Sequence, residues 1–167
     1  MSPRAASQRI VHPFGPLVDA ECEILILGSL PSAKSREQRF FYGHPQNRFW
    51  PLLAALYGEE APAAVEEKRS LALRHHVALW DTIYACDITG ASDSSIRAAV
   101  PTDLRPVLAQ SRITRVFCNG RTSGLYYQRF HQPLLGLEAT VLPSTSPANA
   151  AWSFSRLLEA WRVILGE

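Results

Sequence analysis

Two short segments of the chain combine glycine, proline, hydroxyl and amide side chains in a pattern that core packing does not explain. The first, residues 28–50, contains G-S-L-P-S and then Y-G-H-P-Q-N-R-F-W, and the second, residues 142–149, reads L-P-S-T-S-P-A-N. A glycine after a buried strand lets the backbone approach a ligand closely. Hydroxyl and amide groups can bind phosphate oxygens or the edges of bases. Both segments are therefore candidate binding loops.

In the first segment, Tyr42 and Asn47 are the side chains best suited to a site. Tyr42 lies in an irregular stretch and could offer a flat ring on which a base stacks. Asn47 stands where the N-cap of a helix belongs, and capping alone would account for it. A role in a binding site accounts for it equally well on local grounds. Phe49 and Trp50 are better explained as core residues of the helix that follows.

The second segment places three hydroxyl side chains, Ser144, Thr145 and Ser146, between two prolines. Such a loop is stiff and rich in hydrogen-bond donors. It could be an ordinary connection from a strand to a helix, with Ser146 or Asn149 as the cap. It could also hold a nucleic-acid backbone through its hydroxyl and backbone N–H groups.

Other common kinds of site are excluded because their residues are missing. The chain has neither a G-x-S-x-G elbow nor a G-x-x-x-x-G-K-[ST] phosphate loop. His75 and His76 are adjacent on a predicted helix and point in different directions, so no metal site is expected. The three widely spaced cysteines, Cys22, Cys86 and Cys118, are expected to be free thiols in a reducing cytoplasm.

The composition fits a globular domain and leaves nucleic acid open as a partner. The chain has 167 residues, 47% of them hydrophobic and 19% charged, with a net charge of +2. This excludes a mainly disordered chain, and a basic face can exist within such a near-neutral total. The only lysines, Lys34 and Lys68, lie in polar surroundings, which disfavours Schiff-base chemistry. No signal peptide and no run of the ~20 apolar residues that cross a membrane is found.

Short apolar runs alternate with amphipathic segments, which is typical of a parallel sheet covered by helices. The predicted strands are residues 24–27, 77–80, 115–118 and 139–142. The predicted helices are residues 47–57, 65–76, 102–110, 121–130 and 151–165. We therefore predict an α/β fold, a three-layer α/β/α sandwich around a four-stranded parallel sheet. It would form a single domain over residues 1–167, with an irregular N-terminal arm at residues 1–20.

Ligands of such folds bind beyond the carboxyl ends of the strands. The segments at these ends are residues 28–35, the chain from Asp81 onward, residues 119–120 and residues 143–149. Two of them overlap the candidate binding loops, so we expect the site at this edge of the sheet.

The two candidate loops together resemble the motifs of the uracil-DNA glycosylase superfamily. The first is similar to G-x-N-P-G followed by H-P-x-N-R-F-W, the first motif of the mismatch-specific uracil and thymine glycosylases. The second stands in the place of the strand-insertion motif. The resemblance is specific at these motifs and loose between them. One departure matters: the superfamily's usual catalytic Asn or Asp is here Leu30, which can neither orient nor activate a water.

The sequence resembles one branch in particular, the hypoxanthine-DNA (deoxyinosine) glycosylases, through G-S-L-P, Y-G-H-P, W-D at 80–81, D-S-S-I at 93–96 and L-P-S-T-S-P-A-N. That branch is thought to use an asparagine further along the first motif, and the matching residue, Asn47, is therefore the implied catalytic residue. The implied base-pocket residues are Gly28, Ser29, Leu30, Pro31, Tyr42, Gly43, His44 and Asn119. The implied DNA-binding and insertion-loop residues are Ser35, Ser144, Thr145, Ser146, Pro147 and Asn149.

Two strand-end residues keep a second interpretation. Asn119 could read a base edge through its amide, although a turn before Gly120 explains it slightly better. Asp81 could tie down the loop of the first motif or replace the general base, and we favour structural support.

The resemblance implies a monofunctional enzyme of base excision repair. It would flip a deaminated base, hypoxanthine or uracil, out of double-stranded DNA and hydrolyse the N-glycosidic bond. Asn47 would position water or hydrogen-bond the leaving base, and Arg36, Arg39 and Arg48 would supply charge near the first motif. We expect no cofactor or metal, a monomer, and a cytoplasmic protein. The alternatives are a non-catalytic protein that binds damaged DNA, which Leu30 favours, and, less favoured, a small-molecule hydrolase on a similar fold.

Overall fold

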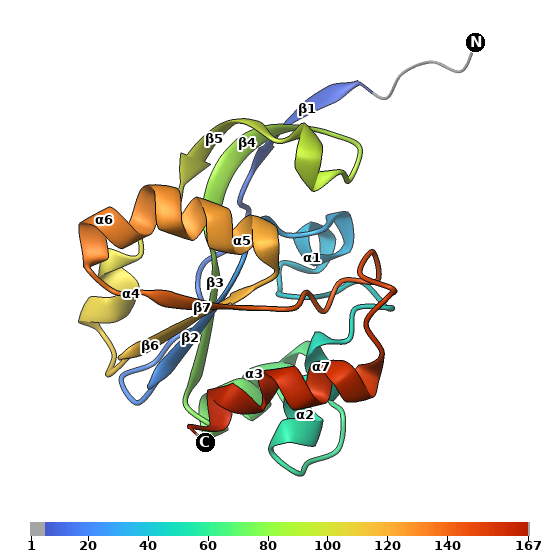
Figure 1. Cartoon of the computed structure of the whole chain (residues 1–167), viewed down its shortest axis with the longest axis vertical. Coiled ribbons are helices and arrows are strands. Elements are labelled where there is room, and N and C mark those ends of the chain that lie inside the picture. The colour runs from blue at the N-terminus through green and yellow to red at the C-terminus, as the bar shows by residue number, and fades with distance from the viewer. Residues whose placement is uncertain (1–5, 167) are drawn as a thin grey trace.

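The computed structural model describes residues 6–166, and its centre is a parallel sheet (Figure 1). The strands are β2 (Ile24–Gly28), β3 (Val77–Asp81), β6 (Arg115–Asn119) and β7 (Ala139–Leu142), in the order β3-β2-β6-β7. All neighbouring pairs are parallel. Every residue of β2 and β3 is buried, as strands covered on both faces require. The predicted α/β fold around a four-stranded parallel sheet is confirmed.

Helices cover both sides of this sheet (Figure 1). On one side lie α5 (Arg121–Tyr126), the π-helix Tyr127–His131 and α6 (Gln132–Leu135). On the other side lie α2 (Phe49–Leu56), α3 (Val65–Arg74) and α7 (Phe154–Trp161), which the 3₁₀ segment Arg162–Leu165 follows; α4 (Arg105–Ala109) precedes β6. Their apolar faces and the sheet share one hydrophobic core, in which Phe49, Tyr127 and Trp161 are fully buried.

A second, antiparallel sheet lies beside the predicted sandwich. Its strands are β1 (Ser7–Val11), β4 (Ile83–Thr89) and β5 (Arg97–Pro101), in the order β1-β4-β5. The prediction of an irregular arm at residues 1–20 is therefore wrong for β1, which pairs with β4 along its whole length. Residues 1–5 of that prediction lie outside the described residues. The sheet buries a small core of its own, made by Ile10, Ile83, Cys86, Ile88 and Ile96.

The two sheets meet next to the first motif. Only Thr82 separates β3 from β4, so the chain passes directly from one sheet to the other. Thr82 N donates to the Gly28 carbonyl at 2.8 Å, and Ile83 N donates to the Ser29 carbonyl at 3.0 Å. After this junction the first motif enters α1 (Ala33–Gln38), where Ser32 caps the helix by accepting from Ser35 N at 3.2 Å. The remaining 3₁₀ turn is Asp93–Ser95.

Candidate active site

The loops at the carboxyl ends of the parallel strands surround a cavity of about 900 Å³. Gly28, Asp81, Asn119 and Leu142, the last residues of the four strands, all line it. The segments predicted from the strand ends therefore meet in one place, as the rule for parallel sheets requires. The predicted site residues that line the cavity are Gly28, Ser29, Leu30, Pro31, Ser35, Tyr42, His44, Asn47, Asp81, Asn119, Ser144, Thr145, Ser146, Pro147 and Asn149.

Asn47 lines the cavity and also caps the helix behind it. Its Oδ1 accepts hydrogen bonds from Phe49 N at 2.9 Å and from Thr145 Oγ1 at 2.8 Å. These bonds use both lone pairs of Oδ1 and fix which end of the amide is oxygen. The Nδ2 group carries two hydrogens and has no hydrogen-bond partner among residues 6–166. Asn47 is thus a cap whose free end is a hydrogen-bond donor.

Thr145 connects Asn47 to Asn119 from a fully buried position. Its Oγ1 accepts from Asn119 Nδ2 at 3.0 Å, and its backbone N donates to Asn119 Oδ1 at 3.0 Å. The side chain of Thr145 has no exposed surface and its hydroxyl is already bonded, so it supports the loop from within, and its contact with DNA stays a prediction. Asn119 is held at both ends of its amide, which leaves it one lone pair and one N–H.

Ser35 and Gly43 support the wall of the cavity from behind. Ser35 is 2% exposed, and its Oγ accepts a hydrogen bond from Gly43 N at 2.8 Å. A Cβ on Gly43 would meet Gln38 Oε1 at 2.7 Å and Ser35 Cα at 3.3 Å, so the turn packs closely against α1. Both residues thus hold the turn at Tyr42, and the contacts of Ser35 with DNA and of Gly43 with the base stay predictions.

Tyr42 presents an aromatic ring and a buried hydroxyl to the cavity. The ring stacks on Phe49, with centroids 4.1 Å apart and planes inclined by 29°. Its hydroxyl is buried and lies near Asp81 and Asn119. Burial raises the pKa of the Tyr42 phenol, and the Asp81 carboxylate raises it further. The hydroxyl therefore remains a neutral donor.

Asp81 is buried, and its carboxylate is paired with His12. The His12 Nε2 donates to Asp81 Oδ2 at 2.7 Å, since an ionised carboxylate can only accept. The other oxygen, Oδ1, lies 2.5 Å from the place that a Cβ on Gly28 would take. Oδ1 has no hydrogen-bond partner in the described part of the chain. Asp81 thus lies against the first motif at Gly28 and accepts its hydrogen bond from His12, and its supporting role stays a prediction.

The insertion loop is held in place by Arg48. The guanidinium of Arg48 donates to the backbone carbonyls of Trp152, Ser146 at 3.3 Å and Asn149 at 3.1 Å. Its backbone N also donates to the Thr145 carbonyl at 3.1 Å. The guanidinium of Arg48 is therefore bonded within the protein, and its expected contribution to the charge near the first motif stays a prediction. Arg48 thus fixes the backbone conformation of the insertion loop.

Comparison with known proteins agrees with this geometry. Residues 15–165 match the model of the uracil DNA glycosylase superfamily. The chain belongs to the uracil DNA glycosylase superfamily. A hypoxanthine DNA glycosylase of Methanosarcina acetivorans is 37% identical over 156 residues, which cover 90% of this chain and 95% of the relative. A hypoxanthine DNA glycosylase of Methanosarcina barkeri is 36% identical over 146 residues, or 81% of this chain and 86% of the relative.

The fold of this DNA glycosylase agrees with a solved relative. The solution NMR structure of a Methanosarcina acetivorans protein, described as a candidate uracil DNA glycosylase, superposes with a TM-score of 0.76. The two chains are 32% identical, and the match covers 91% of this chain and 96% of that one. The expectation of an enzyme that hydrolyses N-glycosidic bonds is therefore confirmed at the level of the class.

In this glycosylase the first motif is fixed by the antiparallel sheet. Leu30, at the position of the usual catalytic residue, packs against the small core of that sheet and lines the cavity. The Pro31 carbonyl accepts a hydrogen bond from Arg36 at 2.8 Å. His44 is exposed at the cavity, and its Nδ1 accepts from Gln46 N at 3.1 Å. The motif is therefore a rigid wall with no carboxylate at its third position.

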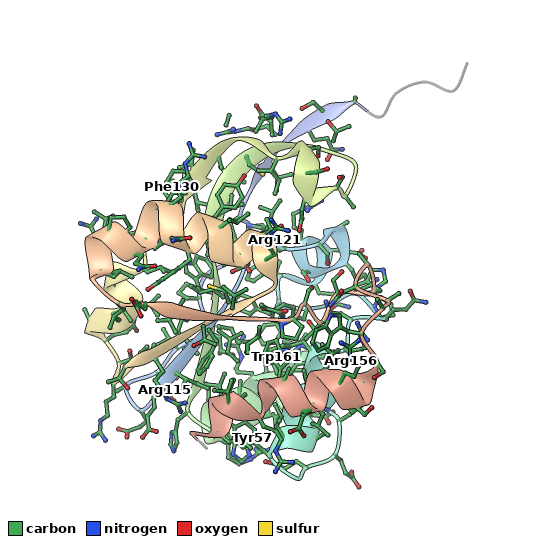
Figure 2. All side chains as sticks on the ribbon, viewed as in Figure 1. Tyr57, Arg115, Arg121, Phe130, Arg156 and Trp161 are labelled. Carbon is green, nitrogen blue, oxygen red and sulfur yellow. The ribbon has the colours of Figure 1, made fainter. Side chains whose placement is uncertain are left out.

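Positive side chains from two segments of the chain stand at the cavity. Lys34, Arg36 and Arg121 all line it, and Figure 2 shows Arg121 where α5 begins. Lys34 lies 3.6 Å from Glu37 in an ion pair.

Across residues 6–166, no group of three or more His, Cys, Asp or Glu could hold a metal ion. No helix in this part is long and apolar enough to cross a membrane.

Proposed function

We propose that this glycosylase removes hypoxanthine from double-stranded DNA, with uracil as a slower second substrate, and leaves an abasic site. The relatives named as hypoxanthine DNA glycosylases support the choice of base. The cavity supports it as well, because about 900 Å³ accommodates an extruded purine nucleotide. A purine also offers more surface than uracil for stacking on the Tyr42 ring, whose other face rests on Phe49.

The observation that carries the choice of hypoxanthine over adenine, its parent base, is the free acceptor at Asp81. Hypoxanthine, like guanine, presents an N–H donor beside a carbonyl, whereas adenine presents a bare ring nitrogen at the same place. Asp81 Oδ1, next to Gly28 and without a protein partner among the described residues, can accept this N–H. The backbone N–H groups of Ser29 and Leu30, which line the same cavity, would donate to the carbonyl. Adenine would place a lone pair against the carboxylate.

Asn47 would act on the leaving base rather than as a base itself. Cleavage of the N-glycosidic bond develops positive charge on the sugar and negative charge on the base. Because Oδ1 of Asn47 is already bonded, its Nδ2 donors are the groups that remain for the departing ring. An amide cannot take a proton from water, so we expect a modest rate. Water then adds to C1′ of the cationic sugar, and the proton that it loses neutralises the departing base anion, so no side chain has to act as a general base.

Extrusion of the base would rely on the insertion loop. Pro147 and Ala148 form its tip, and Arg48 holds the backbone of the loop from below. The hydroxyls of Ser144 and Ser146 accept from Ser146 N at 3.1 Å and Ala148 N at 3.2 Å, which leaves each hydrogen free to donate to a phosphate. Taking a base out of the stack costs a few kcal/mol, least for a mispaired one. The enzyme would act on DNA as a monomer.

The test is release of free base from a set of duplex oligonucleotides that carry deoxyinosine, deoxyuridine, deoxyxanthosine or only normal bases. We expect hypoxanthine release to be fastest, and we expect strand breaks to appear only after alkali, as for an enzyme without a lyase step. Asn47→Ala should abolish release, whereas Gln110→Ala, which alters an exposed amide bonded within its own helix, should not. Tight binding to deoxyinosine without free base would refute the proposal.

A further inference from the structure

His12 is a fully buried histidine that reaches the cavity only through Asp81. It follows β1, and its ring is fixed by Trp80, with centroids 4.4 Å apart, and by the edge of Phe14 at 4.5 Å. Its Nε2 donates to Asp81 Oδ2 at 2.7 Å, and its Nδ1 is buried without a hydrogen bond. The ring therefore has a single polar partner and little freedom to rotate.

The hydrogen bond between His12 and Asp81 is expected to add little to the stability of the fold. A buried ion pair or charged hydrogen bond is often no better than apolar residues of the same size. The bare Nδ1 of His12 adds the desolvation cost of an unpaired polar group. Phe14 and Trp80 already provide an apolar setting in which a phenylalanine at position 12 would pack. Stability alone therefore does not account for His12.

The main chain at Asp81 is fixed by other groups, so His12 has only the carboxylate to hold. Thr102 Oγ1 donates to the Asp81 carbonyl at 2.6 Å, and His131 Nε2 lies 2.9 Å from the Thr82 carbonyl. The hydrogen bond from His12 is the one hydrogen bond among the described residues that holds the carboxylate itself. It occupies Oδ2 and leaves Oδ1 facing Gly28 and the unpartnered hydroxyl of Tyr42.

We propose that His12 is a positioning residue for base selection, which acts by holding Asp81 with one acceptor oxygen toward the base. This inference rests on the proposed function, because it takes the base to be one with an N–H donor at its edge. A carboxylate fixed in this way can accept from hypoxanthine but offers no donor to a bare ring nitrogen. Without His12, the carboxylate can turn away from the base, and the choice between the two kinds of base weakens.

The experiment compares duplex oligonucleotides that carry deoxyinosine or deoxynebularine. The base of deoxynebularine is purine, which lacks the carbonyl and has a bare nitrogen in place of the N–H. We measure kcat/KM for both substrates with the wild type, His12→Phe and His12→Gln. The glutamine keeps an N–H donor, and the phenylalanine keeps only the ring. His76→Asn, at an exposed residue with φ of 63°, is the matched control. Thermal unfolding checks that each variant folds, and His12→Asn replaces His12→Phe if the latter does not.

We expect His12→Phe to lose about tenfold or more of kcat/KM on deoxyinosine and much less on deoxynebularine, as loss of a hydrogen bond to a charged group implies. His12→Gln should keep most of the selectivity. Equal losses on both substrates, or unchanged selectivity in His12→Phe, would overturn the inference and leave His12 a packing residue. If the wild type releases no hypoxanthine, the proposed function fails, and the inference fails with it.

Discussion

Replacing Thr145 with valine removes one hydroxyl at the point where Asn47 and Asn119 are joined. The change keeps the shape of the side chain but deletes the bond from Asn119 Nδ2 at 3.0 Å and the bond to Asn47 Oδ1 at 2.8 Å. Each buried hydrogen bond contributes about 1 kcal/mol net, so the free energy of unfolding should fall by about 2 kcal/mol. Asn47 keeps only its bond from Phe49 N. The loss of orientation should lower the rate of base release about tenfold or more, which corresponds to about 1.4 kcal/mol.

The assay is single-turnover release of hypoxanthine from a deoxyinosine duplex, combined with urea unfolding. Thr145→Ser keeps the hydroxyl and should retain the rate, and Thr114→Val changes an exposed threonine and should alter neither quantity. A folded Thr145→Val variant that releases hypoxanthine at the wild-type rate would refute the reasoning, because it would show that Asn47 does not need the connection to Asn119.

Three further predictions follow from other contacts. Arg48→Met removes the bonds to three loop carbonyls, which should cost about 2 kcal/mol and speed amide exchange at residues 144–152; unchanged exchange would contradict this. Gly28→Ala places a Cβ 2.5 Å from Asp81 Oδ1, so base release should fall about tenfold or more; retained release would show that the carboxylate can move without harm. Burial lowers the pKa of His131, so the folded state resists protonation, and stability should fall as pH drops below about 6.5. His131→Gln should flatten that decline, and parallel declines would contradict it.

The parallel sheet is predictable from the sequence, whereas the antiparallel sheet is not. In β2 and β3 every residue is buried, so the strands appear as unbroken apolar runs. In β4 the exposed Tyr84 lies between the buried Ile83 and Ala85, and the pairing of β4 with β5 shifts register twice. β1 buries only Ile10. A strand with one solvent-exposed face and irregular pairing leaves only a weak alternation of apolar and polar residues, which cannot be distinguished from a loop.

The residues of the site that lie in a sequence motif could be predicted. Residues that reach the site only through a contact between distant parts of the sequence could not. Asn47 and the four strand ends follow from local sequence and from the rule for parallel sheets. His12 lies 69 residues from Asp81, and no spacing connects them. Local sequence also cannot tell whether a loop hydroxyl faces inward or outward. Thr145 and Ser35 were predicted to contact DNA for that reason, and both are buried.

The most direct test of the account is the rate at which Asn47→Asp releases hypoxanthine from a deoxyinosine duplex. The aspartate keeps an oxygen that accepts from Phe49 N and Thr145 Oγ1, so the helix cap survives, but it replaces the free amide donor with an acceptor. If the amide donor stabilises the leaving base, the variant should fold normally and lose about 100-fold or more in single-turnover rate. A folded Asn47→Asp variant that releases hypoxanthine at the wild-type rate would contradict the account.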